Sequence, residues 1–377
     1  MNVAAFSAIK KIEAVHYVGP INPRAISWQK AVSKLRRLAG SQGSFFFFSE
    51  ARLRKIADEV RSRLRPDAQL DFFHGFTPWI LTRPQHPYIA WSDCTFRDYI
   101  DIFHRRDHFS PEDLDRIEQA EASWLKNAQR VLFTSEWAVE RAVRSYRLDA
   151  SRVASVGIFG EMEMPARDCY AQRKEFAFIS TNFEAKGGLV VLAAFREVKK
   201  LHFDASLVIV GDRPSGDVSD PGVSFAGFLR KEVPEDYQRF REILAGARAV
   251  VSATSSDICP LLFVEAGYFG CPVISTRKFA IPEIVDDRST GLLLDDSKNP
   301  GVLAGAMSQL LEASDDYQRM REAAWAKSRG QYSRERFEER LCSRVSEVID
   351  RSGPAGKNID VANVGTILQP RESTGSK

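Results

Sequence analysis

Two acidic side chains, Asp257 and Glu265, lie eight positions apart in the stretch 249–296 and could take part in ligand chemistry. Ionised carboxylates accept hydrogen bonds, so a pair of them suits a ligand with neighbouring hydroxyl groups. An ordinary buried strand–helix–strand unit would explain the apolar residues around these acids. It would not explain both acids at this spacing, and we therefore treat Asp257 and Glu265 as candidate functional residues.

The segments around the two acids predict a βαβ unit of a parallel sheet. A short apolar run ends in the polar loop 252–257, and an amphipathic segment centred near Glu265 follows. A Gly-Cys-Pro turn then precedes a second apolar run. Ligands of such sheets bind at the carboxyl ends of the strands, so Asp257 and Pro260 are expected at that edge.

The same stretch resembles the donor-binding signature of the retaining glycosyltransferases of family 4, which have the GT-B fold. That signature is an acidic residue, seven further residues, a Glu and then a Gly-x-Pro-Val turn. The matching positions in this chain are Asp257, Glu265, Gly270, Pro272, Val273, 281–285 and 291–293. The resemblance implies an α/β protein of the GT-B type, with two Rossmann-like domains whose parallel sheets face each other across a cleft.

The resemblance also implies roles for individual residues of a donor site. Glu265 would hold the ribose of a nucleoside-diphosphate sugar, and Asp257 would hold a hydroxyl of the transferred sugar. The loop 180–188 resembles the family's Gly-Arg-(x)n-Lys-Gly loop, so Lys186 would hold the donor diphosphate. Further substrate-binding positions lie near the predicted helix start, in the turn where relatives place the nucleobase, and at the family's Arg position: Cys259, Pro260, Leu261, Leu262, Phe228 and Thr181.

Two more candidate catalytic residues lie in the first half of the chain, each just past a predicted strand. His74 follows the strand 70–73, and Asp93 follows the strand 87–91. In similar transferases these loops face the acceptor and the transferred sugar, at the sheet edge where α/β proteins place their chemistry. Two plainer alternatives stay open, namely that His74 is a structural histidine and that Asp93 caps the segment after it.

The expected reaction is transfer of a sugar from a nucleoside-diphosphate sugar to an unknown acceptor, with retention of anomeric configuration. The acceptor would be a glycan, a lipid-linked sugar or a small molecule. Lys186 and the backbone N–H groups of residues 259–262 would stabilise the phosphate charge of the leaving group, so neither a metal ion nor a cofactor is expected. The nucleotide sugar is itself a co-substrate.

Three positions depart from the family pattern. Asp257 stands where Glu is usual, Phe279-Ala280 replace a Gly-Gly pair, and Thr181 replaces the Arg that binds phosphate. Arg230 and Lys231 are the alternatives for that missing charge. The departures leave other functions open: a catalytically impaired GT-B protein that binds a sugar nucleotide or a partner, a nucleotide-sugar epimerase, or a phosphorylase.

The order of predicted strands and helices divides the chain into two domains. Residues 1–160 are expected to form an N-terminal, acceptor-side Rossmann-like domain, and residues 175–330 a C-terminal, donor-binding one. A helix at 331–350 is expected to cross back to the first domain. Residues 351–377 are dominated by Ser, Gly, Pro, Asn and Thr and are predicted to be a disordered tail.

Composition narrows the possible classes of protein. The 377 residues are 44% hydrophobic and 27% charged, which is typical of a soluble globular protein with room for two domains. A net charge of +3 gives no argument for nucleic-acid binding, and five scattered cysteines suit a reducing compartment. No apolar run approaches the roughly 20 residues that span a bilayer, and residues 1–11 lack a signal-peptide pattern. We expect a cytoplasmic protein.

The segment 24–65 is basic, with eleven Lys and Arg residues against three Asp and Glu. It contains a predicted helix at 27–38, a predicted buried strand at 45–48 and a second helical pattern. That second pattern carries Arg52, Arg54, Lys55, Arg61 and Arg63. Either this is a solvated helix face, or it contacts an acidic acceptor or an anionic membrane at its inner face.

Overall fold

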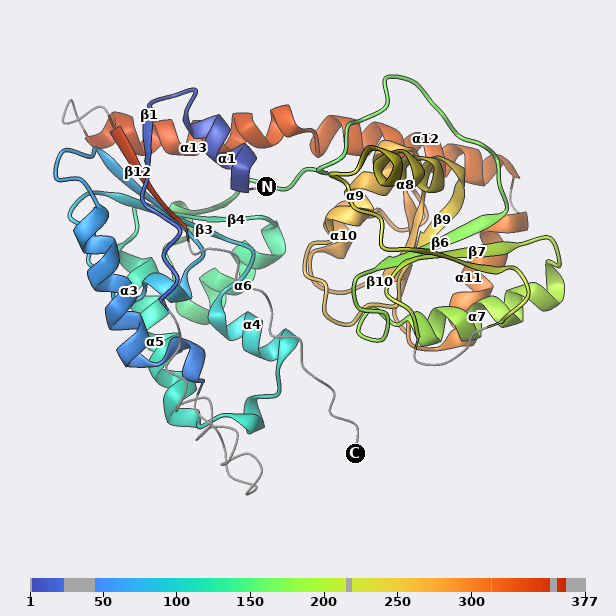
Figure 1. Ribbon diagram of the computed structural model, residues 1–377, viewed down its shortest axis with the longest axis horizontal. Coiled ribbons are helices and arrows are strands. Elements are labelled where there is room, and N and C mark those ends of the chain that lie inside the picture. The colour runs from blue at the N-terminus through green and yellow to red at the C-terminus, as the bar shows by residue number, and fades with distance from the viewer. Residues whose placement is uncertain (1, 24–44, 215–218, 313, 353–357, 364–377) are drawn as a thin grey trace. The chain divides into compact units, whose positions relative to one another are not determined.

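The computed structural model describes residues 2–23, 45–214, 219–312, 314–352 and 358–363, which form two compact α/β units (Figure 1). The N-terminal unit contains residues 2–156 together with the chain from 338 onward. The C-terminal unit contains residues 157–337. None of the helices in the described ranges combines the length and the hydropathy that a membrane span requires.

The N-terminal unit is built on a six-stranded parallel sheet in the order β1-β12-β2-β3-β4-β5. In that order the strands are Ala14–Tyr17, Asn358–Asn363, Leu70–His74, Tyr88–Ser92, Arg130–Phe133 and Val153–Ser155. Its helices are α1 (Asn2–Ile9), α3 (Glu50–Arg63), α4 (Phe96–Phe103), α5 (Pro111–Asn127), α6 (Glu136–Tyr146) and α13 (Arg334–Ser352), the last beginning in the other unit.

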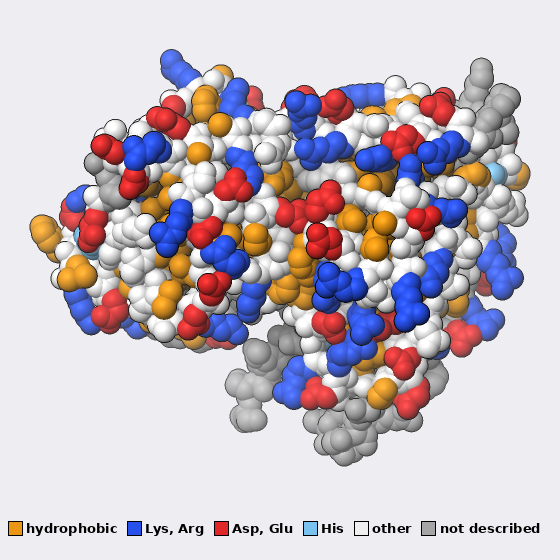
Figure 2. Space-filling view, turned by 180° about the vertical axis from the view of Figure 1, so that it is seen from behind, with side chains coloured by type: hydrophobic (Ala, Val, Ile, Leu, Met, Phe, Trp, Pro, Cys, Tyr) orange, Lys and Arg blue, Asp and Glu red, His pale blue; other side chains and the backbone are white. Residues whose placement is uncertain are grey.

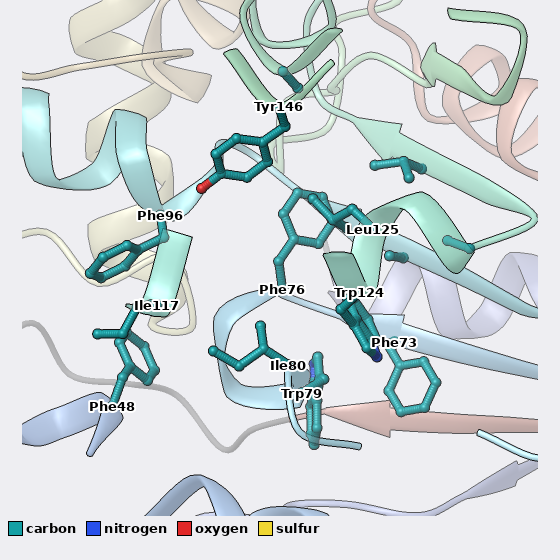
Figure 3. Close-up of a cluster of buried hydrophobic side chains, with 14 of the residues drawn as sticks. Phe48, Phe73, Phe76, Trp79, Ile80, Phe96, Ile117, Trp124, Leu125 and Tyr146 are labelled. Carbon is teal, nitrogen blue, oxygen red and sulfur yellow. The ribbon is translucent and has the colours of Figure 1, made fainter. Parts of the chain in front are cut away.

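Aromatic side chains dominate the core of the N-terminal unit (Figure 3). Phe73 of β2 packs edge to face against Trp124 of α5, with ring centroids 5.5 Å apart, and Trp79 is fully buried beside Phe73. Burying one such side chain contributes about 1.5–3 kcal/mol, so this cluster holds α5 against the sheet. Ser135 accepts a hydrogen bond from the Ala138 N–H and caps the start of α6.

The C-terminal unit is built on a second parallel sheet, in the order β11-β10-β9-β6-β7-β8. These strands are Gly291–Leu294, Val273–Thr276, Ala247–Val251, Glu175–Ser180, Ser206–Gly211 and Val223–Gly227. Its helices are α7 (Gly188–Leu201), α8 (Pro234–Gly246), α9 (Leu261–Tyr268), α10 (Ile281–Ile284), α11 (Pro300–Glu312) and α12 (Ser314–Gln331). The fold class expected from the sequence, α/β with two parallel-sheet domains, is confirmed.

Helices cover both faces of the C-terminal sheet (Figure 1). On one face α7 and α11 pack against the strands, and on the other α8 and α9 do so. The inner strands are therefore buried on both sides, which explains why they are continuous apolar runs such as Leu207–Val210.

The run 45–48, expected as a buried strand, is instead a turn of 3-10 helix at Phe46–Phe48. The rings of Phe45 and Phe48 stack with centroids 5.5 Å apart. Residues three apart lie on one side of a helical turn, so this geometry buries both rings together. A short apolar run does not by itself distinguish the two structures. The helix expected at 27–38 lies outside the described residues.

The disordered tail predicted from residue 351 is wrong for the part of it that the structure describes. Helix α13 continues to Ser352, and β12 lies between β1 and β2 in the N-terminal sheet. Ile359 and Val361 of β12 are fully buried, and Asp360 accepts hydrogen bonds from the Arg65 backbone and guanidinium. The strand is stabilised by partners distant in sequence, which local composition does not reveal.

Candidate active site

The candidate site lies at a topological switch point of the C-terminal sheet. Strands β6 and β9 are neighbours, and the chain leaves β6 toward β7 on one side and β9 toward β10 on the other. Connections that diverge in this way leave room for a ligand at the carboxyl ends of the two strands. The loops 181–187 and 252–260 leave these strand ends, and they carry Lys186 and Asp257.

The structure brings Lys186 and Asp257 together as an ion pair. The Lys186 Nζ lies 2.5 Å from the Asp257 Oδ1, and 24% and 29% of the two side chains are exposed. Both groups therefore remain within reach of a ligand while each neutralises the other. An ammonium beside a carboxylate can bind an anionic group and a hydroxyl group side by side.

Gly187 allows the Lys186 loop to approach the loop after β9. Its φ of +77° lies in the left-handed region, and a Cβ there would stand 2.6 Å from the Cβ of Ala253. Real Cβ atoms do not approach so closely, so a larger residue would push the two loops apart. Glycine at this position is thus a condition for the Lys186–Asp257 ion pair.

Glu265 lies within α9 and is almost completely buried, with 1% of the residue exposed. Its Oε1 accepts hydrogen bonds from the backbone N–H of Glu161, at 3.0 Å, and from the Lys231 Nζ, at 2.5 Å. Burial raises the pKa of the Glu265 carboxyl, while the positive charge of Lys231 acts in the opposite direction. A carboxylate so placed is held rigidly by the protein.

The segment that enters the C-terminal unit passes directly against Glu265. The Gly160 N–H donates to the Tyr268 hydroxyl at 2.8 Å, and a Cβ at Gly160 would stand 2.7 Å from the Glu265 Cγ. Sequence reasoning assigned no role to Gly160 or Glu161. The one available signal was a Gly-Glu pair that follows a predicted strand, and such pairs are too common to indicate a site.

The first turn of α9 offers backbone donors, but fewer than expected. Pro260 is the N-cap residue of α9 and has no N–H group, so it cannot donate a hydrogen bond to phosphate. The N–H groups of Leu261 and Leu262 belong to the first turn and have no acceptor within the helix. Four backbone N–H donors were expected at residues 259–262. Three of these residues have an N–H group, namely Cys259, Leu261 and Leu262.

Two expected substrate-binding residues lie in exposed positions. Thr181 follows the last residue of β6 and presents only a hydroxyl group, and Phe228 follows β8 with 59% of its surface exposed. Of the two cations after Phe228, Arg230 lies near Asp236, with 3.7 Å from its Nε to the carboxylate, and Lys231 reaches Glu265.

His74 and Asp93 lie at the carboxyl edge of the N-terminal sheet. His74 ends β2, its Nδ1 lies 3.3 Å from the Asn363 Oδ1, and its ring centroid is 5.0 Å from that of Trp91. Burial lowers the pKa of His74, which favours the neutral imidazole. Asp93 is exposed and does not cap α4, because Thr95 accepts the capping hydrogen bond from the Asp98 N–H.

Comparison with known proteins finds a family match within the C-terminal unit. Residues 173–313 match the model of the family described as Glycosyl transferases group 1. The chain is 26% identical over 217 residues to a D-inositol 3-phosphate glycosyltransferase of Corynebacterium kroppenstedtii, covering 51% of this chain and 47% of that protein. It is 21% identical over 187 residues to the spore coat protein SA of Bacillus subtilis, covering 45% and 48% of the two chains. The chain thus spans about half the length of these curated relatives.

Solved structures show the fold over most of the chain. The Anabaena protein HepE in complex with UDP is similar over 92% of this chain and 95% of its own, with a TM-score of 0.62 and 14% sequence identity. HepE has also been solved in complex with UDP-glucose. The fold of the present chain is GT-B, as the resemblance implied.

Proposed function

We propose that the chain is a glycosyltransferase that moves a sugar from a nucleoside-diphosphate sugar to an acceptor, with retention of anomeric configuration. The observation that carries the proposal is the pairing of Asp257 and Glu265 with Lys186 and Lys231 at and beside the β6–β9 switch point. The family match to residues 173–313 and the UDP-glucose complex of HepE support it.

In the donor site, each of the two carboxylates would bind a different part of the donor. Glu265 would accept hydrogen bonds from the ribose hydroxyls, and Asp257 would accept one from the transferred sugar. Lys186 and the first-turn N–H groups of α9 would stabilise the charge that develops on the leaving diphosphate. These groups belong to the protein, so the proposal requires neither a metal ion nor a cofactor.

The acceptor would be bound by the N-terminal unit, at the edge that carries His74 and Asp93. Asp93 is exposed, and its carboxylate accepts from the Ser92 hydroxyl at 3.3 Å, so acceptor capacity would remain for a substrate hydroxyl. His74 is held neutral by burial and can accept or donate one hydrogen bond. A glycan, a lipid-linked sugar or a small hydroxylated molecule would fit these donors and acceptors.

A second candidate function is that of a binding protein with little or no transferase activity. The exposed hydroxyl of Thr181 favours it, because a neutral hydroxyl cannot replace a bidentate, charged arginine at a diphosphate. Such a protein would bind a sugar nucleotide without lowering the barrier to cleavage of the sugar–phosphate bond.

A panel of UDP-, GDP-, ADP- and CMP-linked sugars distinguishes the two functions. We would measure the change in melting temperature that each donor causes, and in parallel its hydrolysis and its transfer to mixed glycan and lipid acceptors. Binding with turnover supports the transferase, and binding without turnover supports the second candidate. If no donor binds, both are wrong. Proton NMR of the product's anomeric centre then tests retention.

A further inference from the structure

Lys231 makes a contact that the family pattern does not call for. It lies in the turn after β8, its ammonium is 2.5 Å from the Glu265 Oε1, and it also lies 5.3 Å from the centre of the Phe240 ring. The side chain is 30% exposed, whereas that of its neighbour Arg230 is 74% exposed. The turn therefore aims one of its two cations at the buried carboxylate and leaves the other in solvent.

The contacts of Glu265 fall on one of its two carboxylate oxygens. Oε1 accepts from the Lys231 ammonium and from the Glu161 N–H. Within the part of the chain that the structure describes, Oε2 makes no hydrogen bond. A carboxylate anchored through one oxygen has a fixed orientation, and its second oxygen keeps acceptor capacity for a ligand.

We infer that Lys231 is a positioning residue, which keeps the buried Glu265 ionised and oriented so that Oε2 accepts hydrogen bonds from vicinal hydroxyls of the ligand. The identity of those hydroxyls as ribose hydroxyls rests on the proposed function, whereas the role of Lys231 toward Glu265 does not. A buried carboxylate without a cation would take up a proton, and a protonated carboxyl accepts hydrogen bonds poorly.

The other titratable groups near Glu265 do not replace Lys231. The Glu161 carboxylate has the same charge as Glu265 and raises the pKa of the Glu265 carboxyl further. Tyr268, one turn along α9, has its pKa raised to about 12 by burial and stays neutral. With Lys231 removed, burial and Glu161 both favour the protonated form of Glu265, so its pKa must rise.

The first test measures the affinity for UDP-glucose by isothermal titration calorimetry between pH 5.5 and 8.5. The diphosphate of UDP-glucose keeps its charge over this range, so only protein groups titrate. We expect Lys231→Met to lose affinity as pH falls, by about tenfold for each pH unit below the raised pKa of Glu265. Lys231→Arg should restore the parent's profile, and the control Lys200→Met, at an exposed lysine that pairs with Glu197, should not change it. A pH-independent loss in Lys231→Met would overturn the inference.

A double-mutant cycle separates positioning from direct contact with the donor. Glu265→Gln has no charge to stabilise, so adding Lys231→Met to it should cost less than a further twofold in affinity for UDP-glucose. If Lys231→Met instead weakens binding equally in both backgrounds, Lys231 contacts the donor itself and the positioning role is wrong.

A third measurement needs no ligand. The pKa of Glu265 is raised in the folded state, so its burial costs stability as pH rises from the unfolded pKa through the folded one. In Lys231→Met the folded-state pKa of Glu265 is higher, so the pH range over which stability is lost extends further upward. The melting temperature of Lys231→Met should therefore fall further below the parent's at pH 8 than at pH 5. The pH dependence should vanish in the Glu265→Gln background. A difference that is the same at both pH values would overturn the inference even if the parent binds no sugar nucleotide.

Discussion

The Lys186 ammonium and the Asp257 carboxylate form an ion pair of 2.5 Å between the loops that follow β6 and β9. Each group is the other's counter-charge, so in the proposed transferase a donor that binds Lys186 through phosphate would compete with Asp257. Asp257 would then be available to a sugar hydroxyl. This exchange of partners would couple recognition of the diphosphate to recognition of the transferred sugar.

The first prediction concerns Lys186→Ala. The full leaving-group charge exists only in the transition state, so we expect turnover to fall by on the order of 100-fold and donor affinity to fall much less. Stopped assays give kcat, and calorimetry gives the dissociation constant of the donor. Lys200→Ala is the matched control, since Lys200 lies on α7 and pairs with Glu197. Equal losses of kcat and affinity would restrict Lys186 to ground-state binding.

The second prediction concerns Glu265→Ala. Loss of a charge-assisted hydrogen bond to the ribose costs about 1.5–3 kcal/mol of binding free energy. The increase in melting temperature that a nucleoside-diphosphate sugar gives the parent should therefore disappear. Glu242→Ala, at an exposed position of α8, should keep it. An unchanged ligand-induced shift in Glu265→Ala would rule out the ribose-binding role.

The third prediction concerns Gly187→Ala. The left-handed φ costs an L-residue about 1–2 kcal/mol, and the clash with Ala253 adds to it. We expect a lower melting temperature and weaker donor binding, because the Lys186 loop must move away from Asp257. Gly305 of α11 has open space around its Cα, so Gly305→Ala should instead stabilise by about 0.5–1 kcal/mol. Full donor affinity in Gly187→Ala would show that the loop contact is dispensable.

The fourth prediction concerns β12. Ending the chain after Ser352 removes a strand from between β1 and β2, and the N-terminal unit should then fail to fold cooperatively. Circular dichroism and limited proteolysis measure this. A chain that ends after Asn363 keeps β12 and should melt like the full chain. Cooperative melting of the shorter variant at the parent's temperature would contradict the central role of β12.

The fifth prediction concerns the basic helix α3. Arg52 is buried and donates to the Phe47 carbonyl, while Arg54, Arg61 and Arg63 pair with Glu50, Asp58 and Glu59. On the face shown in Figure 2, basic and acidic side chains lie among one another. Paired charges attract anionic lipid weakly, so we expect no sedimentation with phosphatidylserine vesicles. Sedimentation at low salt that is lost at high salt would support membrane contact.

Local sequence determined much of this protein. The apolar runs predicted the strands at the site, because a strand buried on both faces needs a continuous apolar run. The start of α6 at Ser135 is also encoded locally, because capping depends on neighbouring residues. The spacing of Asp257 and Glu265 was visible because the loop and helix that carry them are contiguous in the chain.

Tertiary structure decided what depends on residues distant in sequence. Segment 358–363 is a strand only because β1 and β2 supply its hydrogen-bond partners. Lys186 meets Asp257 because β6 and β9 are neighbours, an order set by packing of the whole sheet. Lys231 contacts Glu265 from the turn after β8. The sequence of that turn predicts neither the contact with the carboxylate nor which of the two adjacent cations makes it. Ion pairs between separate loops form after the sheet has brought those loops together, and no local pattern of residues encodes them.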